Sequence, residues 1–320
     1  TNCNAPCTVT IPDANFKAAL VGNGLINTNG NSEIECAEAA AFNDTLNVNG
    51  LNISDLTGLE AFTSITQLYC SNNNITSIDV SVLPQITGLD VSSNMLTTID
   101  VSANVNLTYF VCSNNQLSTL DVSTLNNLFV LRFRQNTVST IDVSNMPNLE
   151  SFDAGLNGLT SLDFSNNPNI EYISAFSNNL TSVNVANRQD LQFLFLHTND
   201  LTTIDVSTVP NLKAIALGSN DIASIDLSNN ALLSEFTVQN GQFTSLDFSN
   251  NPALFIFNGS DNDLMSLNMA NGNNAGLGNN FYATGNPNLS CIQIDGSFTP
   301  PTGWQKDATA SYSDNCSGLD

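Results

Sequence analysis

Hydrophobic residues recur along this chain with a period of 21. Large aliphatic residues open ten successive segments without a slip in the interval: Ile65, Ile86, Leu107, Leu128, Leu149, Ile170, Leu191, Leu212, Leu233 and Leu254. In a segment such as residues 191–207, positions 1, 4, 6, 11, 14 and 16 are apolar, and most of the others are Asn, Ser, Thr or Asp. The alternation over positions 2 to 6 predicts one short strand in each segment. One segment cannot bury these apolar side chains alone, so consecutive segments must stack as coils around a shared core.

The spacing of the apolar positions is the signature of a leucine-rich repeat solenoid. We therefore predict a β-rich repeat solenoid, a right-handed horseshoe with a concave parallel sheet. Because a bare terminal coil exposes its core, both ends need caps. We place a helical N-terminal cap at residues 1–45, repeats over 46–280 and a C-terminal cap at 281–320, with a transitional coil at 46–64 and regular repeats from 65. Residues 11–20 predict a short helix, and Trp304, the single tryptophan, is expected in the core of the second cap.

Two rows of polar residues follow the same period. Position 9 carries Asn73, Asn94, Asn115, Asn136, Asn157, Asn178, Asn199, Asn220 and Asn262, with Gly241 interrupting the row. These side chains are expected to satisfy backbone groups inside the turn and to bond their counterparts in the next coil. Position 15 carries Asp79, Asp100, Asp121, Asp142, Asp163, Asn184, Asp205, Asp226, Asp247 and Asn268. This row favours turn-forming bonds to nearby amides, and a metal or catalytic array is the alternative.

The charge balance narrows the classes of partner. The chain has 29 acidic residues against 6 Lys plus Arg, a formal net charge of −23. That excess argues against nucleic acid, whose phosphates need a basic footprint, and against anionic membranes. The absence of a run of 18 apolar residues in the sequence excludes membrane insertion by a helix. We expect a monomer.

The cysteines divide by their place in the repeat. Cys70 and Cys112 share position 6 two coils apart, so their backbones should lie about 10 Å from each other. A disulfide needs Cα atoms within about 7 Å, so both are expected as buried thiols. Near the N-terminus, Cys3, Cys7 and Cys36 form an odd set, and at least one of them should be free.

The short repeat Leu-Thr-x-Ile-Asp-Val-Ser-x-x-Pro-Asn-Leu, present at residues 138–149 and 201–212 with Val138 in place of the first Leu and Ser139 in place of Thr, resembles repeats of secreted bacterial leucine-rich repeat proteins, internalin-like in layout, and those common in flavobacterial surface proteins. The resemblance covers nearly the whole chain. It implies a secreted or cell-surface location, and the start at Thr1 without Met fits a trimmed secreted product. The segment Asn-Pro-Asn-Leu-Ser-Cys-Ile at residues 286–292 matches the family, where it closes a cap, and this implies a disulfide between Cys291 and Cys316.

Residues 27–38 have the spacing of an EF-hand calcium loop. Oxygen-bearing side chains stand at positions 1, 3, 5, 7, 9 and 12 of this segment, which are Asn27, Asn29, Asn31, Glu33, Glu35 and Glu38. Asn27 and Asn31 replace the usual carboxylates and Ser32 replaces glycine, which lowers the charge of the ligand set. The alternative is a metal-free loop between two cap helices. Beyond a structural Ca²⁺, no cofactor is expected.

Side chains at the outward positions of the predicted strands do not pack in the core, so a ligand would bind there. Three of the six basic residues and the single histidine fall on these rows, together with a group of aromatic side chains. The candidate ligand site is Phe129, Arg132, Arg134, Asp153, Tyr172, Phe176, Phe193, Phe195, His197 and Lys213. Concentrated aromatic and positive groups on an acidic protein suggest a binding site. The plainer interpretation is an Arg132–Asp153 surface pair and a Tyr172–Phe193 pair that stabilises the sheet.

These patterns favour a non-enzymatic extracellular recognition module. An anionic polysaccharide would suit aromatic rings and arginine forks, and a protein ligand is the close alternative. The chain could also serve as an adhesion module or a spacer of a cell-surface protein. The remote alternative is a glycan-active enzyme using Glu150 and Glu171, which occupy position 2 of adjacent coils at an expected separation of about 5 Å. No other catalytic motif is present in the sequence.

Overall fold

The computed structural model describes residues 7–317, and the chain divides into two compact units, Thr1–Leu149 and Glu150–Asp320. In the first unit, the strands β1 (Thr45–Asn47), β2 (Gln67–Tyr69), β3 (Gly88–Asp90), β4 (Tyr109–Val111) and β5 (Val130–Arg132) follow one another in a parallel sheet. From β2 on, each residue pairs with the residue 21 positions later, as Leu68 does with Leu89. The period of the sequence is therefore the register of the sheet.

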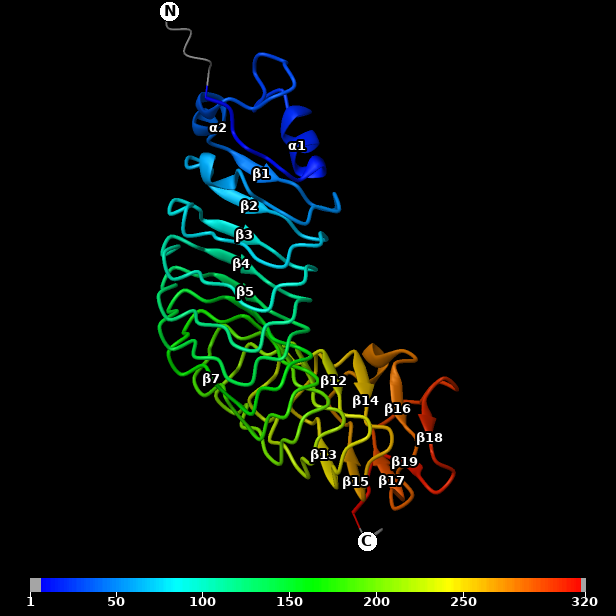
Figure 1. The fold of residues 1–320 in the computed structure, drawn as a ribbon. Helices are drawn as coiled ribbons and strands as arrows, with labels where there is room; N and C mark the ends of the chain where they lie inside the picture. The colour runs from blue at the N-terminus through cyan, green and yellow to red at the C-terminus, as the bar shows by residue number, and fades with distance from the viewer. Residues whose placement is uncertain (1–6, 318–320) are drawn as a thin grey trace, which may run out of the picture. The chain divides into compact units, whose positions relative to one another are not determined.

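The second unit has the same arrangement of coils, and several of them carry a second strand on their other side (Figure 1). The front sheet, as we call it, contains in order β6 (Ser151–Asp153), β8 (Tyr172–Ser174), β10 (Phe193–Phe195), β11 (Ala214–Ala216), β12 (Glu235–Thr237), β14 (Ile256–Asn258), β16 (Phe281–Ala283) and β18 (Gln305–Lys306). The back strands are β7 (Ser161–Asp163) with β9 (Ser182–Asn184), and β13 (Ser245–Asp247), β15 (Ser266–Asn268), β17 (Cys291–Gln293) and β19 (Ser311–Ser313). A parallel-strand solenoid is confirmed.

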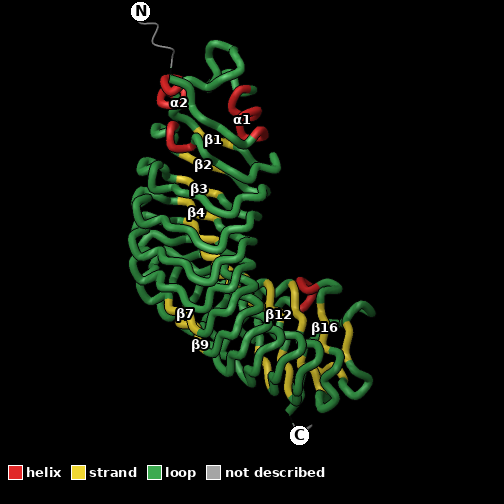
Figure 2. The backbone as a smooth tube through the Cα atoms, in the orientation of Figure 1, coloured by secondary structure: helices red, strands yellow, loops and turns green. Residues whose placement is uncertain are grey.

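The core is built from the apolar positions of the repeat. In the coil that opens at Leu191, Leu194, Leu196 and Leu201 are fully buried, and so are the matching residues of its neighbours. The front strands span positions 3 to 5 only, shorter than the predicted positions 2 to 6, and most of each coil is loop (Figure 2). Three residues suffice because stacking of successive coils, rather than strand length, supplies the buried area.

The asparagine row holds each turn to the coil before it. Asn94 accepts the Ile75 N–H at 3.0 Å and donates to Cys70 O and Val91 O, both at 3.0 Å. The predicted role in pairing backbone groups of the turn is confirmed by the bond to Val91 O. The other two bonds run to the backbone of the preceding coil and not to the Asn of the next coil. Asn286 extends the asparagine row by accepting the Leu264 N–H at 3.1 Å. The 21-residue period misses it because the stretch at 270–280, where a 3₁₀ turn η2 (Asn274–Leu277) forms, lengthens that coil.

The aspartate row shapes turns, as predicted. Asp205 Oδ1 accepts the Ser207 N–H at 2.9 Å and its hydroxyl at 2.6 Å, and the same backbone bond recurs in other coils. The back strands pair where an Asn follows an Asp in this row. Asn184 donates to Asp163 at 2.9 Å between β7 and β9, and Asn268 donates to Asp247 at 3.0 Å between β13 and β15. There the amide replaces carboxylate repulsion with a cross-strand bond.

The N-terminal cap is helical, as predicted. Helix α1 (Ala14–Val21) buries Phe16 and Leu20, and helix α2 (Cys36–Ala41) and a 3₁₀ turn η1 (Leu59–Ala61) follow. The first helix begins three residues later than the sequence suggested, because the Asp13 side chain accepts the Asn15 and Phe16 N–H groups and so acts as its N-cap.

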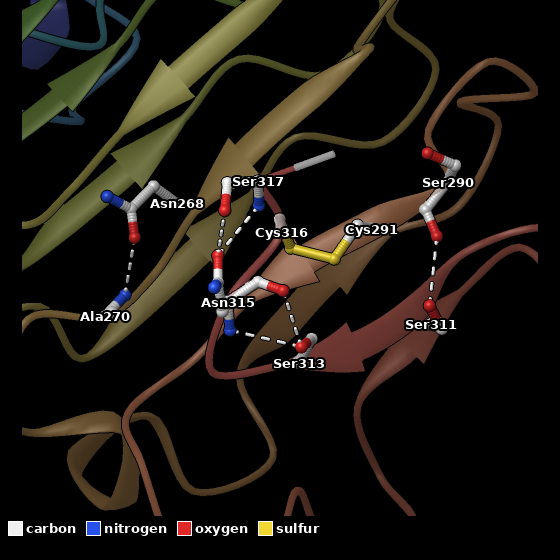
Figure 3. The surroundings of a disulfide bond; sticks show 9 residues. All are labelled: Asn268, Ala270, Ser290, Cys291, Ser311, Ser313, Asn315, Cys316 and Ser317. Atoms are coloured by element: carbon white, nitrogen blue, oxygen red, sulfur yellow. Dashed lines mark hydrogen bonds between the residues drawn. A yellow bond between two sulfur atoms is a disulfide. The ribbon is translucent and has the colours of Figure 1, made fainter. Parts of the chain in front are cut away.

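Two disulfides close the caps. Cys291 and Cys316 are joined with their Cα atoms 5.8 Å apart, which confirms the predicted bond and ties β17 to the segment after β19 (Figure 3). Cys7 is joined to Cys36, while Cys3 lies outside the described residues. The thiols of Cys70 and Cys112 are buried and unpaired, as predicted, and burial raises the pKa of Cys70 to about 12.

The aromatic core of the C-terminal cap is also as predicted. Trp304 is 6% exposed, stacks on Phe281 with ring centroids 4.2 Å apart, and donates from Nε1 to Gly278 O at 2.8 Å. Between residues 7 and 317, no helix has the length and apolar character to cross a bilayer.

Candidate functional site

Five rings gather at two adjacent strands of the front sheet in the second unit, three on the strands and two at positions two residues beyond the strand ends. Strands β8 and β10 pair in register, Tyr172 with Phe193 and Ser174 with Phe195. Because alternate residues of a strand point to the same side, this register places five side chains on one face. We call this group the aromatic surface, and it consists of Tyr172, Phe176, Phe193, Phe195 and His197. All five side chains are partly exposed.

Three of these rings form a tilted group. The centroids of Tyr172 and Phe195 lie 5.7 Å apart at an interplanar angle of 68°. Tyr172 and Phe193 are 6.3 Å apart at 47°, and Phe193 and Phe195 are 6.4 Å apart at 33°. These separations and angles are typical of favourable aromatic contacts. Because the rings are not stacked in parallel, they do not cover one another's faces completely.

Phe176 and His197 form a parallel stack beside that group. Their centroids lie 4.8 Å apart at 7°, which matches the spacing of neighbouring strands. Burial lowers the pKa of His197 from its usual 6.5, because a half-buried imidazole loses hydration when it is charged. Burial therefore favours the neutral imidazole, which offers one donor and one acceptor nitrogen.

Two other residues of the predicted site surround the aromatic surface. Lys213, exposed just before β11, donates from Nζ to Gln192 Oε1 at 2.7 Å. Asp153, on β6, accepts the Gly155 N–H at 3.2 Å. They add one positive and one negative charge next to the rings.

The remaining predicted residues belong to the first unit. Phe129 is 40% exposed and precedes β5, Arg132 is an exposed residue of β5, and Arg134 is exposed two residues later. Of the predicted site, these three residues thus belong to the first unit and the other seven to the second. The Arg132–Asp153 pair stays a prediction.

The sequence-based selection omitted a tyrosine pair on the first unit. Tyr69 of β2 and Tyr109 of β4 lie edge to face with centroids 6.4 Å apart, and the Tyr69 hydroxyl would be 3.3 Å from a Cβ atom on Gly88 of β3. Burial, and after it the charge of Asp90, raises the pKa of Tyr109. The sequence signal for this pair was Gly88. Because Gly88 has no side chain, the rings of the coil before it and the coil after it have space to meet.

The predicted calcium loop forms a network of hydrogen bonds. Asn29 and Asn31 donate to the two carboxylate oxygens of Glu35, each at 2.8 Å. Glu38 Oε1 accepts the Thr28 N–H at 2.8 Å, while Glu33 points to Lys17 with an Nζ–Oε2 distance of 2.7 Å.

Asn27 is buried and donates to Val21 O and Asn31 O at 3.0 and 2.8 Å. Glu35 and Glu38 therefore face the loop as ligands would, and position 7 of such a loop binds through its carbonyl, which leaves Glu33 free to pair with Lys17. Over residues 7–317, no group of three or more His, Cys, Asp or Glu side chains is arranged to hold a metal. Calcium binding by this mixed Asn and Glu set stays a prediction.

The two acidic residues of the enzyme alternative lie on an open surface. The Glu171 N–H donates to Glu150 O at 2.9 Å, which places them on neighbouring coils, and both side chains are exposed. A glycosidase needs one carboxyl held protonated by an apolar pocket. These exposed positions do not provide one.

The fold matches known leucine-rich repeat structures. The functional domain of InlJ from Listeria monocytogenes is 25% identical with a TM-score of 0.65, over 88% of this chain and 74% of that one. The internalin InlF from Listeria monocytogenes is 20% identical with a TM-score of 0.66, over 98% of this chain and 99% of that one. The protein has an internalin-like leucine-rich repeat fold.

Other comparisons agree with this internalin-like fold. Residues 33–167 match the family described as the endo-beta-N-acetylglucosaminidase EndoS LRR domain. A chain of the LRIM1/APL1C complex is 20% identical with a TM-score of 0.60, over 84% of this chain and 48% of that one. No curated protein matches the sequence. An internalin-like fold is consistent with a non-enzymatic recognition or binding module, and the Cys291–Cys316 and Cys7–Cys36 disulfides suggest a secreted or surface location.

Proposed function

We propose that this internalin-like protein is a non-enzymatic extracellular recognition module that binds a polysaccharide on the aromatic surface of its second unit. The observation that carries the proposal is the convergence of five partly exposed rings on β8, β10 and the residues that directly continue them. Leaving apolar rings in water forgoes about 25 cal/mol for each Å² that burial would remove from solvent. A contiguous group of such rings is therefore typical of a binding surface.

The chemistry of this surface suits a sugar polymer. The tilted rings of Tyr172, Phe193 and Phe195 offer apolar contact to the C–H faces of sugar rings. The Tyr172 hydroxyl, the His197 imidazole and the Lys213 ammonium supply hydrogen bonds at its margin. The family that matches residues 33–167 is named for the repeat domain of an enzyme that acts on a glycan, which supports this ligand class.

The first unit carries a separate feature that suits an anionic polymer. Arg132 and Arg134 are both exposed there, and guanidinium groups bind carboxylate or sulfate in a bidentate manner. Their contribution is separable from that of the rings, because the two groups lie on different units and can be changed independently.

A protein ligand is the second candidate. One similar structure is a chain of the LRIM1/APL1C complex, and aromatic side chains are common anchors at protein interfaces. The same aromatic surface would serve either ligand. The distinction is therefore made by the ligand panel and not by the site variants.

The test is a binding screen of the protein against neutral and anionic polysaccharides, with three variants. Replacing Phe193 and Phe195 by Ala should weaken binding at least about tenfold, since loss of two buried aromatic contacts costs well over 1.4 kcal/mol. Replacing Phe255 by Ala is the matched control, because this ring is 54% exposed on the same unit and precedes β14. It should leave binding unchanged.

The third variant carries Ala at positions 132 and 134. It should weaken binding of anionic polymers only, and more strongly at low ionic strength, where charge contacts are least screened. Absence of binding to every polysaccharide by the unmodified protein, or equal binding by the Phe193/Phe195 variant with unchanged melting temperature, would reject the polysaccharide proposal. Capture of a purified protein ligand that depends on the same rings would then establish the second candidate.

A further inference from the structure

Gly155, two residues after the end of β6, lies under the ring of Phe176. A Cβ atom added at position 155 would lie 2.5 Å from Phe176 Cε1 and 2.9 Å from both Cδ1 and Cζ. Contacts below 3.0 Å are essentially absent between real Cβ atoms and their neighbours, and here the neighbour is a rigid ring. The backbone of Gly155 is not left-handed, so the turn itself does not require glycine. Position 155 thus lacks a side chain at the place where the Phe176 ring occupies the space.

The space above Gly155 decides how the Phe176 ring is held. On one side the ring contacts the coil at Gly155, and on the other it stacks against His197 with centroids 4.8 Å apart at 7°. The Phe176 ring therefore lies between the backbone at Gly155 and the imidazole of His197. Any side chain at position 155 would push Phe176 toward His197 or away from the sheet.

A second glycine bounds the same row on the other side. Position 7 of five successive coils carries Gly155, Phe176, His197, Gly218 and Gln239. A Cβ atom on Gly218 would be 2.6 Å from the backbone O of Gln239 and 3.2 Å from its side-chain Cδ, so here the backbone of the next coil, more than a side chain, occupies the space. The ring pair is thus set between two positions without side chains.

We infer that Gly155 is a positioning residue of the ligand-binding surface, which seats Phe176 and thereby fixes the Phe176–His197 pair for contact with the ligand. The inference deepens the proposed function and, for its effect on binding, rests on it. It also specifies the ligand atoms. With its two sides occupied, Phe176 presents a ring edge, which carries the positive end of the aromatic quadrupole. Hydroxyl or carboxylate oxygens of a polysaccharide suit this edge, whereas the C–H faces of the sugar suit the tilted rings of Phe193 and Phe195.

The single histidine of the sequence provides a readout that does not depend on ligand. His197 is the only imidazole in the chain, so its NMR resonances identify themselves. In the protein as it stands, burial lowers the pKa of His197. In Gly155→Ala, displacement of Phe176 should expose the imidazole and move its pKa up toward 6.5. Loss of one aromatic pair contact should weaken polysaccharide binding by about two- to tenfold.

Two further variants keep the test decisive. Gly296→Ala is the control, since Gly296 is exposed in the same unit and its added Cβ would meet only Asp314 Oδ2 at 4.0 Å. It should change neither the titration nor binding. In Gly155→Ala/Phe176→Leu the smaller side chain relieves the clash. The melting temperature of this double variant should therefore be higher than that of Gly155→Ala, while its polysaccharide binding stays weak.

The outcomes separate this inference from the proposed function. An unchanged His197 pKa in a folded Gly155→Ala protein would overturn the role of Gly155, whether or not polysaccharide binds. A shifted pKa with full binding would overturn the role of the ring pair in recognition. A shifted pKa in a protein that binds no polysaccharide, before or after substitution, would uphold the positioning of the ring pair and reject polysaccharide as the ligand.

Discussion

Replacing Asn220 by alanine is expected to destabilise the second unit by several kcal/mol. This side chain is 4% exposed and belongs to the asparagine row. It accepts the Leu201 N–H at 3.0 Å and donates to Leu196 O at 3.0 Å and Leu217 O at 2.8 Å. The single amide therefore joins two coils and closes the turn of its own coil.

The magnitude follows from the groups that lose a partner. Alanine removes the acceptor of the Leu201 N–H and the donor to Leu217 O, whereas Leu196 O keeps its bond from Asn199 at 2.9 Å. An unsatisfied buried backbone group costs about 1 to 3 kcal/mol. Two such groups give an expected loss of about 2 to 6 kcal/mol.

Urea denaturation followed by circular dichroism measures this loss, and amide hydrogen exchange at Leu201 locates it. Asn229→Ala is the matched control, because Asn229 is an exposed residue of the same coil with one bond, to Ser207 O at 3.1 Å. It should change the free energy of unfolding by no more than about 0.5 kcal/mol. A loss below about 1 kcal/mol for Asn220→Ala would refute the argument that the row holds the coils together.

Asn220→Asp tests the same reasoning through pH. The carboxylate can accept the Leu201 N–H but cannot donate, and burial raises its pKa in the folded state above the unfolded value of about 3.9. The folded protein then binds the extra proton, so its stability should fall as the pH rises above about 4. A pH-independent stability difference between Asn220→Asp and the parent would contradict this.

Three further predictions follow from local features. Thr198 has a φ of 59°, which a β-branched residue resists, so Thr198→Asn should stabilise the protein by about 0.5 to 1 kcal/mol while Thr202→Asn, in an ordinary conformation, should not; equal melting temperatures would contradict this. Asp13→Ala should cost about 1 kcal/mol at pH 7. Partial burial raises the pKa of Asp13, but bonds from Ser54 and the start of α1 lower it by more, so the contribution present above pH 3.8 should be lost as the pH falls below that value. A cost of Asp13→Ala that is the same at pH 3 and pH 7 would refute this. Millimolar calcium should raise the melting temperature of the parent and not of Glu38→Ala, and identical melting in calcium and in chelator would remove the proposed site.

The residues of the aromatic surface could be named from sequence, but their arrangement could not. Their positions in the repeat place Tyr172, Phe193 and Phe195 on the outward face, and the structure keeps them there, partly exposed. Spacing says nothing of ring orientation, however, and therefore nothing of the parallel stack of Phe176 on His197. The grouping of these rings with Arg132 and Arg134 stays a prediction, because those arginines belong to the first unit and the rings to the second.

The disulfides show the same limit. The Cys291–Cys316 bond was expected because the surrounding segment resembles a known cap, and it is present. The pairing of Cys7 with Cys36 could not be chosen from three candidate residues, because it depends on how the cap folds back on itself: Val9 N bonds Ile34 O at 2.8 Å and brings the two segments together.

By itself, the sequence determined the stack of coils and its register. A period of 21 with fixed apolar and Asn positions admits one repeating solution, in which each strand pairs with the residues one period later and each Asn bonds the coil before it. The tertiary structure alone decided which back strands pair, how the rings tilt or stack, and why Gly155 has no side chain. Those features depend on contacts between particular side chains of neighbouring coils, such as Asn184 with Asp163 and Phe176 over Gly155, which a repeating pattern does not encode because it treats all coils alike.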